Sequence, residues 1–210
     1  MKIKVFCLLL TMVLPLHAED SILVEQLHQA YDQVQYFEAE FVQNKQVKFL
    51  SKPLVSTGVI KYAPTHGMIW EVVKPIWVKT KINNEGIFKT NSFEQNVKVN
   101  DVQMQAVADI LGELLGARLD RMRSQFELSA SQLSDDQLHW EATLIPRSKL
   151  IKKALAQLHI EGLLDEAGQG QGISKITLVD PNENITTIVF SEVVMFNEQS
   201  PPAELLHDFQ

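Results

Sequence analysis

The sequence of 210 residues predicts an α+β fold, mainly β, in which a curved antiparallel sheet has helices on one side. Runs that alternate between apolar and polar residues follow one another between Gly and Pro breaks, which is typical of strands joined by hairpins. Two other stretches have the 3.6-residue period of an amphipathic helix, one near the N-terminus and one after residue 101. Because the order is helix, strands, helix, strands, the pattern argues against an alternating βαβ array.

The first helix and the first strand follow each other directly. Apolar side chains recur at Leu23, Leu27 and Tyr31, which predicts an amphipathic helix over residues 21–34. Residues 37–41 then read Phe, Glu, Ala, Glu, Phe, the two-residue period of a strand with one buried face. Further strands are predicted over residues 58–62, 68–73 and 76–82, followed by a turn at 83–86.

The spacing of the apolar residues changes again after residue 101, from the two-residue period of a strand to the period of a helix. A stripe of apolar side chains predicts a helix over residues 102–117, which packs against the open side of the sheet either as a movable lid or as a fixed cover. Gly112 and Gly116 each lower its helix propensity by ~1 kcal/mol relative to alanine, which would ease partial opening. The stripe consists of Val107, Ile110, Leu111, Leu114 and Leu115. Strands are predicted again over residues 138–145, 154–164, 173–180 and 185–196.

Two predicted strands are apolar on both faces. In residues 68–73 and 185–196, both sets of alternate positions carry large apolar side chains. A sheet with one hydrated face would alternate more cleanly, so each face of these strands needs a cover. Either helices pack on one side as an ordinary core, or the sheet curls around an apolar interior with room for a ligand. The pattern alone leaves both alternatives open.

The first 18 residues have the features of a secretory signal peptide. A basic start precedes an apolar run over residues 5–16, and Leu16-His17-Ala18 offers a cleavage site. The run is shorter than the ~20 residues of a membrane-spanning helix. Cys7 lies inside it and would leave with it, so a mature chain would have neither a disulfide nor a thiol nucleophile. We expect one secreted domain over residues 19–210.

Acidic residues outnumber basic ones. The chain has 19 Lys and Arg against 26 Asp and Glu; without Lys2 and Lys4 of the leader the balance is 17 against 26, a net charge of −9. An acidic surface repels phosphate backbones, so we expect no nucleic-acid partner. The same charge argues against unassisted docking on anionic lipid headgroups.

Residues that carry catalysis or bind metals show no recognisable arrangement. His28, His66, His139 and His159 are scattered, without the spacing of metal ligands. The glycine-rich residues 168–172 precede a predicted strand instead of a helix, so we interpret them as a hairpin connection and not as a phosphate loop. No serine lies in a Gly-x-Ser-x-Gly setting. We therefore expect no enzymatic activity, no metal and no cofactor.

Several short motifs follow one another along most of the chain, each at one position. They are Phe37-x-Ala39-x-Phe41-x-Gln43, Ser56-x-Gly58, Tyr62-x-Pro64, Trp70, Pro75, the proline-terminated segment 140–146, and Phe196 with Pro201-Pro202. Their order resembles that of the LolA family of periplasmic lipoprotein carriers and its LolA-like relatives. The resemblance implies an unclosed antiparallel β-barrel capped by α-helices, with acyl chains held in an apolar cavity.

The resemblance also implies a function. The chain would be a periplasmic carrier, or chaperone, that shields lipoprotein acyl chains or another lipid during transfer towards the outer membrane. Its partners would be an inner-membrane exporter and an outer-membrane acceptor protein, and it would be a monomer that does not span a membrane. We expect the cavity to be lined by Phe41, Ile60, Trp70, Val78, Ile110, Leu114, Trp140 and Phe190.

One position departs from the family pattern. In the best-known carriers an arginine stands before the proline of the strand that precedes the tryptophan, and it helps to control cargo release; here Ala63 stands before Pro64. We therefore expect no cation–cargo contact at residue 63, and the cargo stays open between a lipoprotein and another lipid. The alternative function is a lipid-responsive sensor or interaction domain on the same fold. A lipid hydrolase would need a nucleophile and base that the sequence does not offer.

Overall fold

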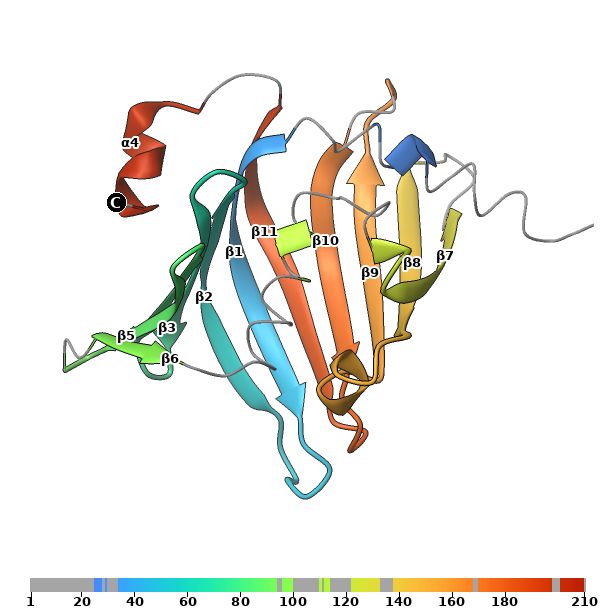
Figure 1. Cartoon of the computed structure of the whole chain (residues 1–210), viewed down its shortest axis with the longest axis horizontal. Helices are drawn as coiled ribbons and strands as arrows, with labels where there is room; N and C mark the ends of the chain where they lie inside the picture. Colours follow the sequence, from blue (N-terminus) through green and yellow to red (C-terminus); the bar gives the residue numbers. More distant parts are fainter. Residues whose placement is uncertain are drawn as a thin grey trace, which may run out of the picture.

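The computed structural model describes residues 25–27, 29, 34–93, 96–99, 110, 112–113, 122–132, 138–167, 170–197 and 201–209, and its main feature is one antiparallel sheet of 11 strands (Figure 1). The strands are β1 (Val34–Gln46), β2 (Leu54–Ala63), β3 (Gly67–Lys74), β4 (Val78–Asn83), β5 (Gly86–Asn91), β6 (Asn96–Val99), β7 (Phe126–Gln132), β8 (His139–Pro146), β9 (Gln157–Leu164), β10 (Gly170–Val179) and β11 (Ile185–Asn197). The helices whose bounds lie within the described residues are η1 (Ile151–Lys153), α4 (Ala203–Leu206) and η2 (His207–Phe209).

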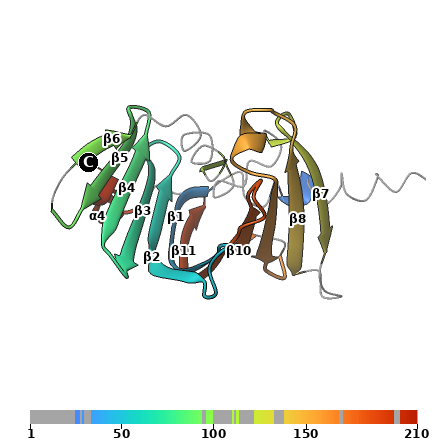
Figure 2. The same cartoon turned by 90° about the horizontal axis from the view of Figure 1, so that it is seen from below.

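The strand order is β6-β5-β4-β3-β2-β1-β11-β10-β9-β8-β7. The chain steps outward from β1 to the edge at β6, reappears at the opposite edge as β7, and steps back to β11. β1 and β11 then pair antiparallel along their length, with Phe41 opposite Phe190. Figure 2 shows that the sheet bends into a trough, with β1 and β11 at its base and the two groups of strands as its walls. The unclosed antiparallel sheet that the sequence motifs predict is confirmed.

The inside of the trough is apolar. Strand residues alternate between faces and paired residues share a face, so apolar residues at alternate positions of neighbouring strands gather on the inner face. Ala39 at the base pairs with Ile60 in one wall, and Ile60 pairs with Trp70. In the other wall Ile176 pairs with Ile160. Side chains from both walls form one buried cluster, which includes Phe37, Ala39, Phe41, Ile60, Met68, Trp140, Ala142, Leu144, Leu158, Ile160, Ile173, Ile176, Ile188 and Phe190.

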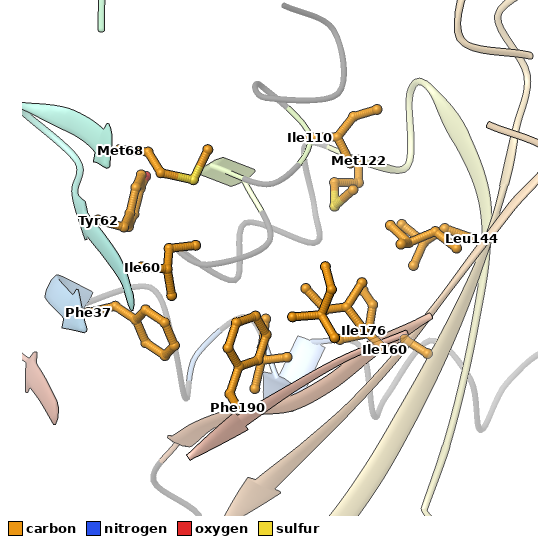
Figure 3. Close-up of a cluster of buried hydrophobic side chains, with 14 of the residues drawn as sticks. Phe37, Ile60, Tyr62, Met68, Ile110, Met122, Leu144, Ile160, Ile176 and Phe190 are labelled. Atoms are coloured by element: carbon orange, nitrogen blue, oxygen red, sulfur yellow. The ribbon is translucent and has the colours of Figure 1, made fainter. Parts of the chain in front are cut away.

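The connection between β6 and β7 runs between opposite edges of the sheet, and its described residues cover the open side of the trough. Ile110 and Met122 belong to the same buried cluster as the strand side chains. Figure 3 shows both of them facing Tyr62 and Met68 on one wall and Leu144 on the other. Ile110, Gly112 and Glu113 are helical. The rest of the predicted helix over residues 102–117 lies outside the described residues.

The outer face of the sheet has a smaller apolar cluster of its own. The C-terminal helices fold back onto β1, β2 and β3, where Phe209 is buried against Tyr36, Ala63 and Ile69. Figure 1 shows this segment standing apart from the trough, on the outside of the sheet. The two apolar faces of residues 68–73 are thus explained, since Met68 and Trp70 belong to the inner cluster and Ile69 to the outer one.

Several predicted boundaries need correction. Residue 34 begins β1 and does not end a helix, although residues 25–27 and 29 are helical. The strand predicted over 154–164 begins only at Gln157, because the N–H groups of Ala154 and Leu155 donate to the Ile151 carbonyl in a helical turn. The strand predicted from residue 76 begins at Val78. Strands β5, β6 and β7 and the C-terminal helices are absent from the sequence prediction.

Gly162 in β9 permits a close approach that any larger residue would prevent. A Cβ atom at this position would lie 2.3 Å from Cζ2 of Trp140, whose side chain is fully buried. Overpacking of this kind costs about 1–3 kcal/mol. We expect Gly162→Ala to lower the free energy of unfolding by about that amount in urea denaturation. Gly112→Ala is the control, because its Cβ would meet Tyr62 at an ordinary 3.6 Å. Equal losses in both variants would contradict the packing of Trp140 on the β9 backbone.

Candidate functional site

Six of the predicted cavity-lining residues meet in the inner cluster. Phe41, Ile60, Ile110, Trp140 and Phe190 are buried in it, and Trp70 packs against it while staying partly exposed. Val78 in β4 is half-buried and pairs with Val72, so it shares the inner face. Leu114 lies outside the described residues. The structure therefore brings the predicted residues together on one face, but the buried ones pack against each other as a core.

Trp70 connects this core to solvent. Its ring lies 4.2 Å from that of Phe41 between centroids, at an interplanar angle of 32°. Phe37 and Phe190 meet edge to face at 6.1 Å across the base of the trough. Aromatic pairs of this kind stabilise a packed interior by about 0.5–1.5 kcal/mol beyond their buried area. Trp70 is thus held on its inner side by Phe41, while its other side lines an open groove.

That groove has a volume of about 490 Å³ and lies at one end of the trough. Its apolar side chains are those of Trp70, Leu155, Leu178 and Ile188. Its polar side chains are those of Gln43, Lys45, Asp180, Asn184 and Thr186, and Ala154 completes the lining. The volume falls within the range of ~300–1,000 Å³ that is usual for ligand pockets. The arrangement is that of an apolar slot with a polar rim.

The rim is charged, and internal hydrogen bonds hold its turn. The Asp180 carboxylate accepts hydrogen bonds from the backbone N–H groups of Asn182 and Asn184, at 2.8 and 2.9 Å, and from Asn184 Nδ2 at 2.7 Å. Although burial acts to raise it, these hydrogen bonds, with the charge of Lys45, hold the pKa of Asp180 below its usual range. An ionised Asp180 and Lys45 therefore stand on the same rim. Such groups keep water at the entrance and leave the interior for apolar ligand atoms.

The outer cluster places Ala63 away from the trough. Ala63 is buried against Phe209, on the face opposite Tyr62 and Ile60. Lys61 secures the same segment through a 2.6 Å ion pair with Asp208, and Lys81 Nζ donates to the Phe209 carbonyl. Burial, reinforced by Glu38, raises the pKa of Tyr36 far above its usual value. An arginine at residue 63 would therefore point outward at the C-terminal segment and away from the inner cluster.

A ladder of charged side chains crosses the outer face of β8, β9 and β10. His159 Nε2 lies 3.2 Å from Glu141 Oε2 and 3.6 Å from Glu161 Oε1, and Lys175 Nζ lies 2.7 Å from Glu161 Oε1. Thr143 Oγ1 lies within hydrogen-bonding distance, 3.1 Å, of His159 Nδ1. Among the residues that the structure describes, no cluster of His, Cys, Asp and Glu could hold a metal ion. We interpret the ladder as cross-strand pairing that stabilises the sheet.

Sequence reasoning missed most of the groove. Leu178 and Ile188 follow the strand alternation that identified Phe190, so the same pattern could have selected them. Leu155 could not be found this way, because it was expected in a strand and lies instead after η1. The rim residues Asp180 and Asn184 belong to a turn, where periodicity carries no information.

Comparisons with known proteins concern the fold. A scan against models of protein families and a search of curated proteins each found no match. Similar solved structures include a LolA superfamily protein from Nitrosomonas europaea, at 7% identity over 87% of this chain and 96% of that one, with a TM-score of 0.43. A putative outer membrane lipoprotein-sorting protein domain from Vibrio parahaemolyticus has 8% identity over 89% and 96%, with a TM-score of 0.45.

The MucA/MucB complex of Pseudomonas aeruginosa provides another similar chain, at 13% identity and a TM-score of 0.46, over 90% of this chain and 60% of that one. LolA superfamily proteins are thus among the structural neighbours. Since all three TM-scores lie below 0.5, we argue function from this chain's own residues. Within the described part of the chain, no helix is long and apolar enough to cross a bilayer.

Docking of the C-terminal segment should depend on pH. The hydrogen bond from Lys61 holds the pKa of Asp208 below its usual range. A lowered carboxyl pKa contributes stability above the ordinary value of ~4 and loses it as the pH falls through the lowered value. We therefore expect protection of residues 203–209 from hydrogen exchange to fall below about pH 4. In Asp208→Asn, protection should be lower at neutral pH and should lack this dependence; an unchanged pH profile would contradict the role of the ion pair.

Replacing Ala63 should affect the outer face of the sheet and leave the inner face unchanged. Ala63→Arg puts a long cation where Phe209 packs against Tyr36 and Ile69, so we expect the C-terminal segment to detach and become sensitive to proteolysis. Binding of a fluorescent fatty acid should stay unchanged, because residue 63 faces away from the trough. Ala63→Gly, which leaves the space open, is the control. Lost ligand binding with an intact C-terminal segment would contradict this assignment of faces.

Proposed function

We propose that this chain is a carrier that shields the acyl chains of a lipid or lipoprotein in its trough and transfers them without chemical change. The observation that carries the proposal is the groove of about 490 Å³, whose apolar floor is continuous with the inner cluster through Trp70. A carrier needs an interior that offers no hydrogen bonds to a hydrocarbon chain, with polar groups confined to the entrance. The groove has this distribution.

The energetics favour hydrocarbon cargo. Removing apolar surface from water contributes about 25 cal/mol per Å², so each methylene placed between Trp70 and Leu178 adds about 0.8 kcal/mol. Part of the apolar lining of the groove is still accessible to a ligand, because the side chains of Trp70, Ala154 and Leu178 are only half-buried. The polar rim can at the same time contact a headgroup or a lipidated N-terminus. Binding would therefore select the acyl chain and tolerate varied headgroups.

We place this activity in the periplasm, towards the outer membrane, because residues 1–18 read as a secretory leader. An inner-membrane exporter would load the carrier and an outer-membrane acceptor would unload it. An apolar groove releases its ligand only to a site of higher affinity or on a change of shape, and an acceptor protein would supply one or the other. We further propose that the chain acts as a monomer without a cofactor and is not an enzyme.

A sensor or interaction domain is the second candidate. It is favoured by the outer cluster, where Phe209 occupies an apolar site that a partner's segment could also fill. The two functions differ in their ligand dependence. For a sensor, ligand binding in the groove must change docking of the C-terminal segment; for a carrier, the two should be independent.

Filling the groove should weaken ligand binding. Thr186 lines the groove, and Thr187 follows it on the opposite face of the same strand. We expect Thr186→Trp to weaken binding of a fluorescent fatty acid about tenfold or more, since the indole takes the place of the hydrocarbon. The matched variant Thr187→Trp should bind like wild type. Titration of the fatty acid into each protein gives the dissociation constants.

Each result has a clear meaning. Equal weakening in both variants would indicate general destabilisation, which thermal denaturation of the two proteins would reveal. Wild-type binding in Thr186→Trp would place the ligand outside this groove. Failure of the wild-type protein to bind any fatty acid or apolar dye would remove the carrier proposal.

A further inference from the structure

The hairpin between β1 and β2 ends in an apolar tip. Phe49 is 90% exposed, the largest exposed fraction among the exposed large apolar residues that the structure describes, and Leu50 beside it is 43% exposed. The tip is an ordered turn, in which Leu50 N–H donates to the Val47 carbonyl at 2.9 Å and Gln46 Nε2 lies 3.4 Å from the Leu50 carbonyl. Leu54 and Val55 continue the exposed apolar surface into β2. Contiguous exposed apolar surface is more typical of interaction sites than single exposed apolar residues are.

Hydrogen bonds fix the tip beside the entrance of the groove. Lys48 N–H donates to Asn184 Oδ1 at 3.0 Å, and Lys48 Nζ forms a 2.6 Å ion pair with Glu183. Asn184 and Lys45 are themselves rim residues of the groove. In Figure 1 the hairpin and the turn between β10 and β11 project together from the lower end of the sheet. The apolar tip and the groove entrance therefore face the same side of the molecule.

The charge of this hairpin differs from that of the whole chain. Residues 41–59 contain no Asp or Glu but three lysines, Lys45, Lys48 and Lys52, whereas the full chain has a net charge of −7. Glu183 forms an ion pair with Lys48, and Lys45 lies near enough to Asp180 to lower the pKa of that carboxyl, so Lys52 is the basic group nearest the tip that these two acids do not offset. The three lysines of the hairpin outnumber Asp180 and Glu183 of the turn that it contacts, so the net acidity that argues against docking on anionic lipids does not extend to the hairpin. A basic, apolar tip matches the interface of an anionic bilayer.

We propose that the β1–β2 tip docks this protein on the surface of an anionic lipid bilayer, with Phe49 and Leu50 in the interfacial region and Lys52 among the headgroups. Docking would present the groove entrance to the lipid that enters or leaves it. This inference rests on the proposed carrier function for its purpose, but the contact itself can be measured without any cargo.

Vesicle binding tests the contact. The probes are vesicles of phosphatidylcholine alone and of phosphatidylcholine mixed with phosphatidylglycerol, and the readout is co-sedimentation. We expect wild type to bind the anionic vesicles, and Phe49→Asp to lose about tenfold or more in partitioning, since it removes one large apolar side chain. Lys52→Glu should weaken binding to anionic vesicles and reduce its dependence on salt. Fatty-acid binding in solution should be unchanged in both variants.

Phe93→Asp is the matched control. Phe93 is 83% exposed, but it follows β5, away from the groove residues, so its variant should bind vesicles like wild type. Wild-type vesicle binding by Phe49→Asp, or an equal loss in Phe93→Asp, would overturn the proposal. So would the absence of vesicle binding by wild type, which would assign the tip to a protein partner. If the protein binds fatty acids but not vesicles, the docking proposal fails and the carrier proposal stands. If it binds vesicles but not fatty acids, the docking proposal stands and the carrier proposal fails.

Discussion

The pairing of β1 with β11 is the constraint on which the rest of the structure depends. It joins two strand series that are each built from local hairpins, and it does so between residues far apart in sequence, such as Phe41 and Phe190. Without it, each series would be a sheet with one uncovered apolar face. With it, the two apolar faces turn towards each other and form one cluster. Long-range pairing of this kind is slow to form, because the chain must close a large loop before the contact is gained.

The same pairing explains why the trough is covered on one side and open at one end. Once β1 and β11 are adjacent, β6 and β7 are the two outer edges of the sheet, and the chain between them has to travel from one edge to the other. Ile110 and Met122 on this connection complete the core from the open side. The groove lies at the end where the hairpin after β1 and the turn before β11 emerge together. Topology therefore determines both the cover and the entrance.

Local patterns in the sequence predicted the sheet but not its complete form. Residues 68–73 and 185–196 were assigned correctly as strands with two apolar faces. The inner face of each packs in the curled interior, but on the outer face the C-terminal helices cover Ile69, whereas Val189 and Val194 are 44% and 45% exposed. β5 lacks a clear period, because its two apolar residues Ile87 and Phe88 are adjacent, whereas β7 has one, since Phe126, Leu128 and Ala130 alternate with polar residues, and the pattern could have predicted it. The groove was missed because its floor combines Trp70, Leu155 and Ile188 from distant segments. Such a site depends on register and curvature, which no single segment encodes.

The two walls of the trough differ in how many of their side chains are buried. This difference affects the route by which an apolar ligand leaves. The described side chains of β4 are all half-buried, and in β5 only Ile87 is fully buried. In β8 and β9, by contrast, every second residue from Trp140 to Leu144 and from Leu158 to Ile160 is buried. Local opening costs least where few apolar contacts are lost. The β4–β5 wall, and not the β8–β9 wall, is therefore where the trough can widen at the lowest free-energy cost, and release by widening needs no cation at residue 63.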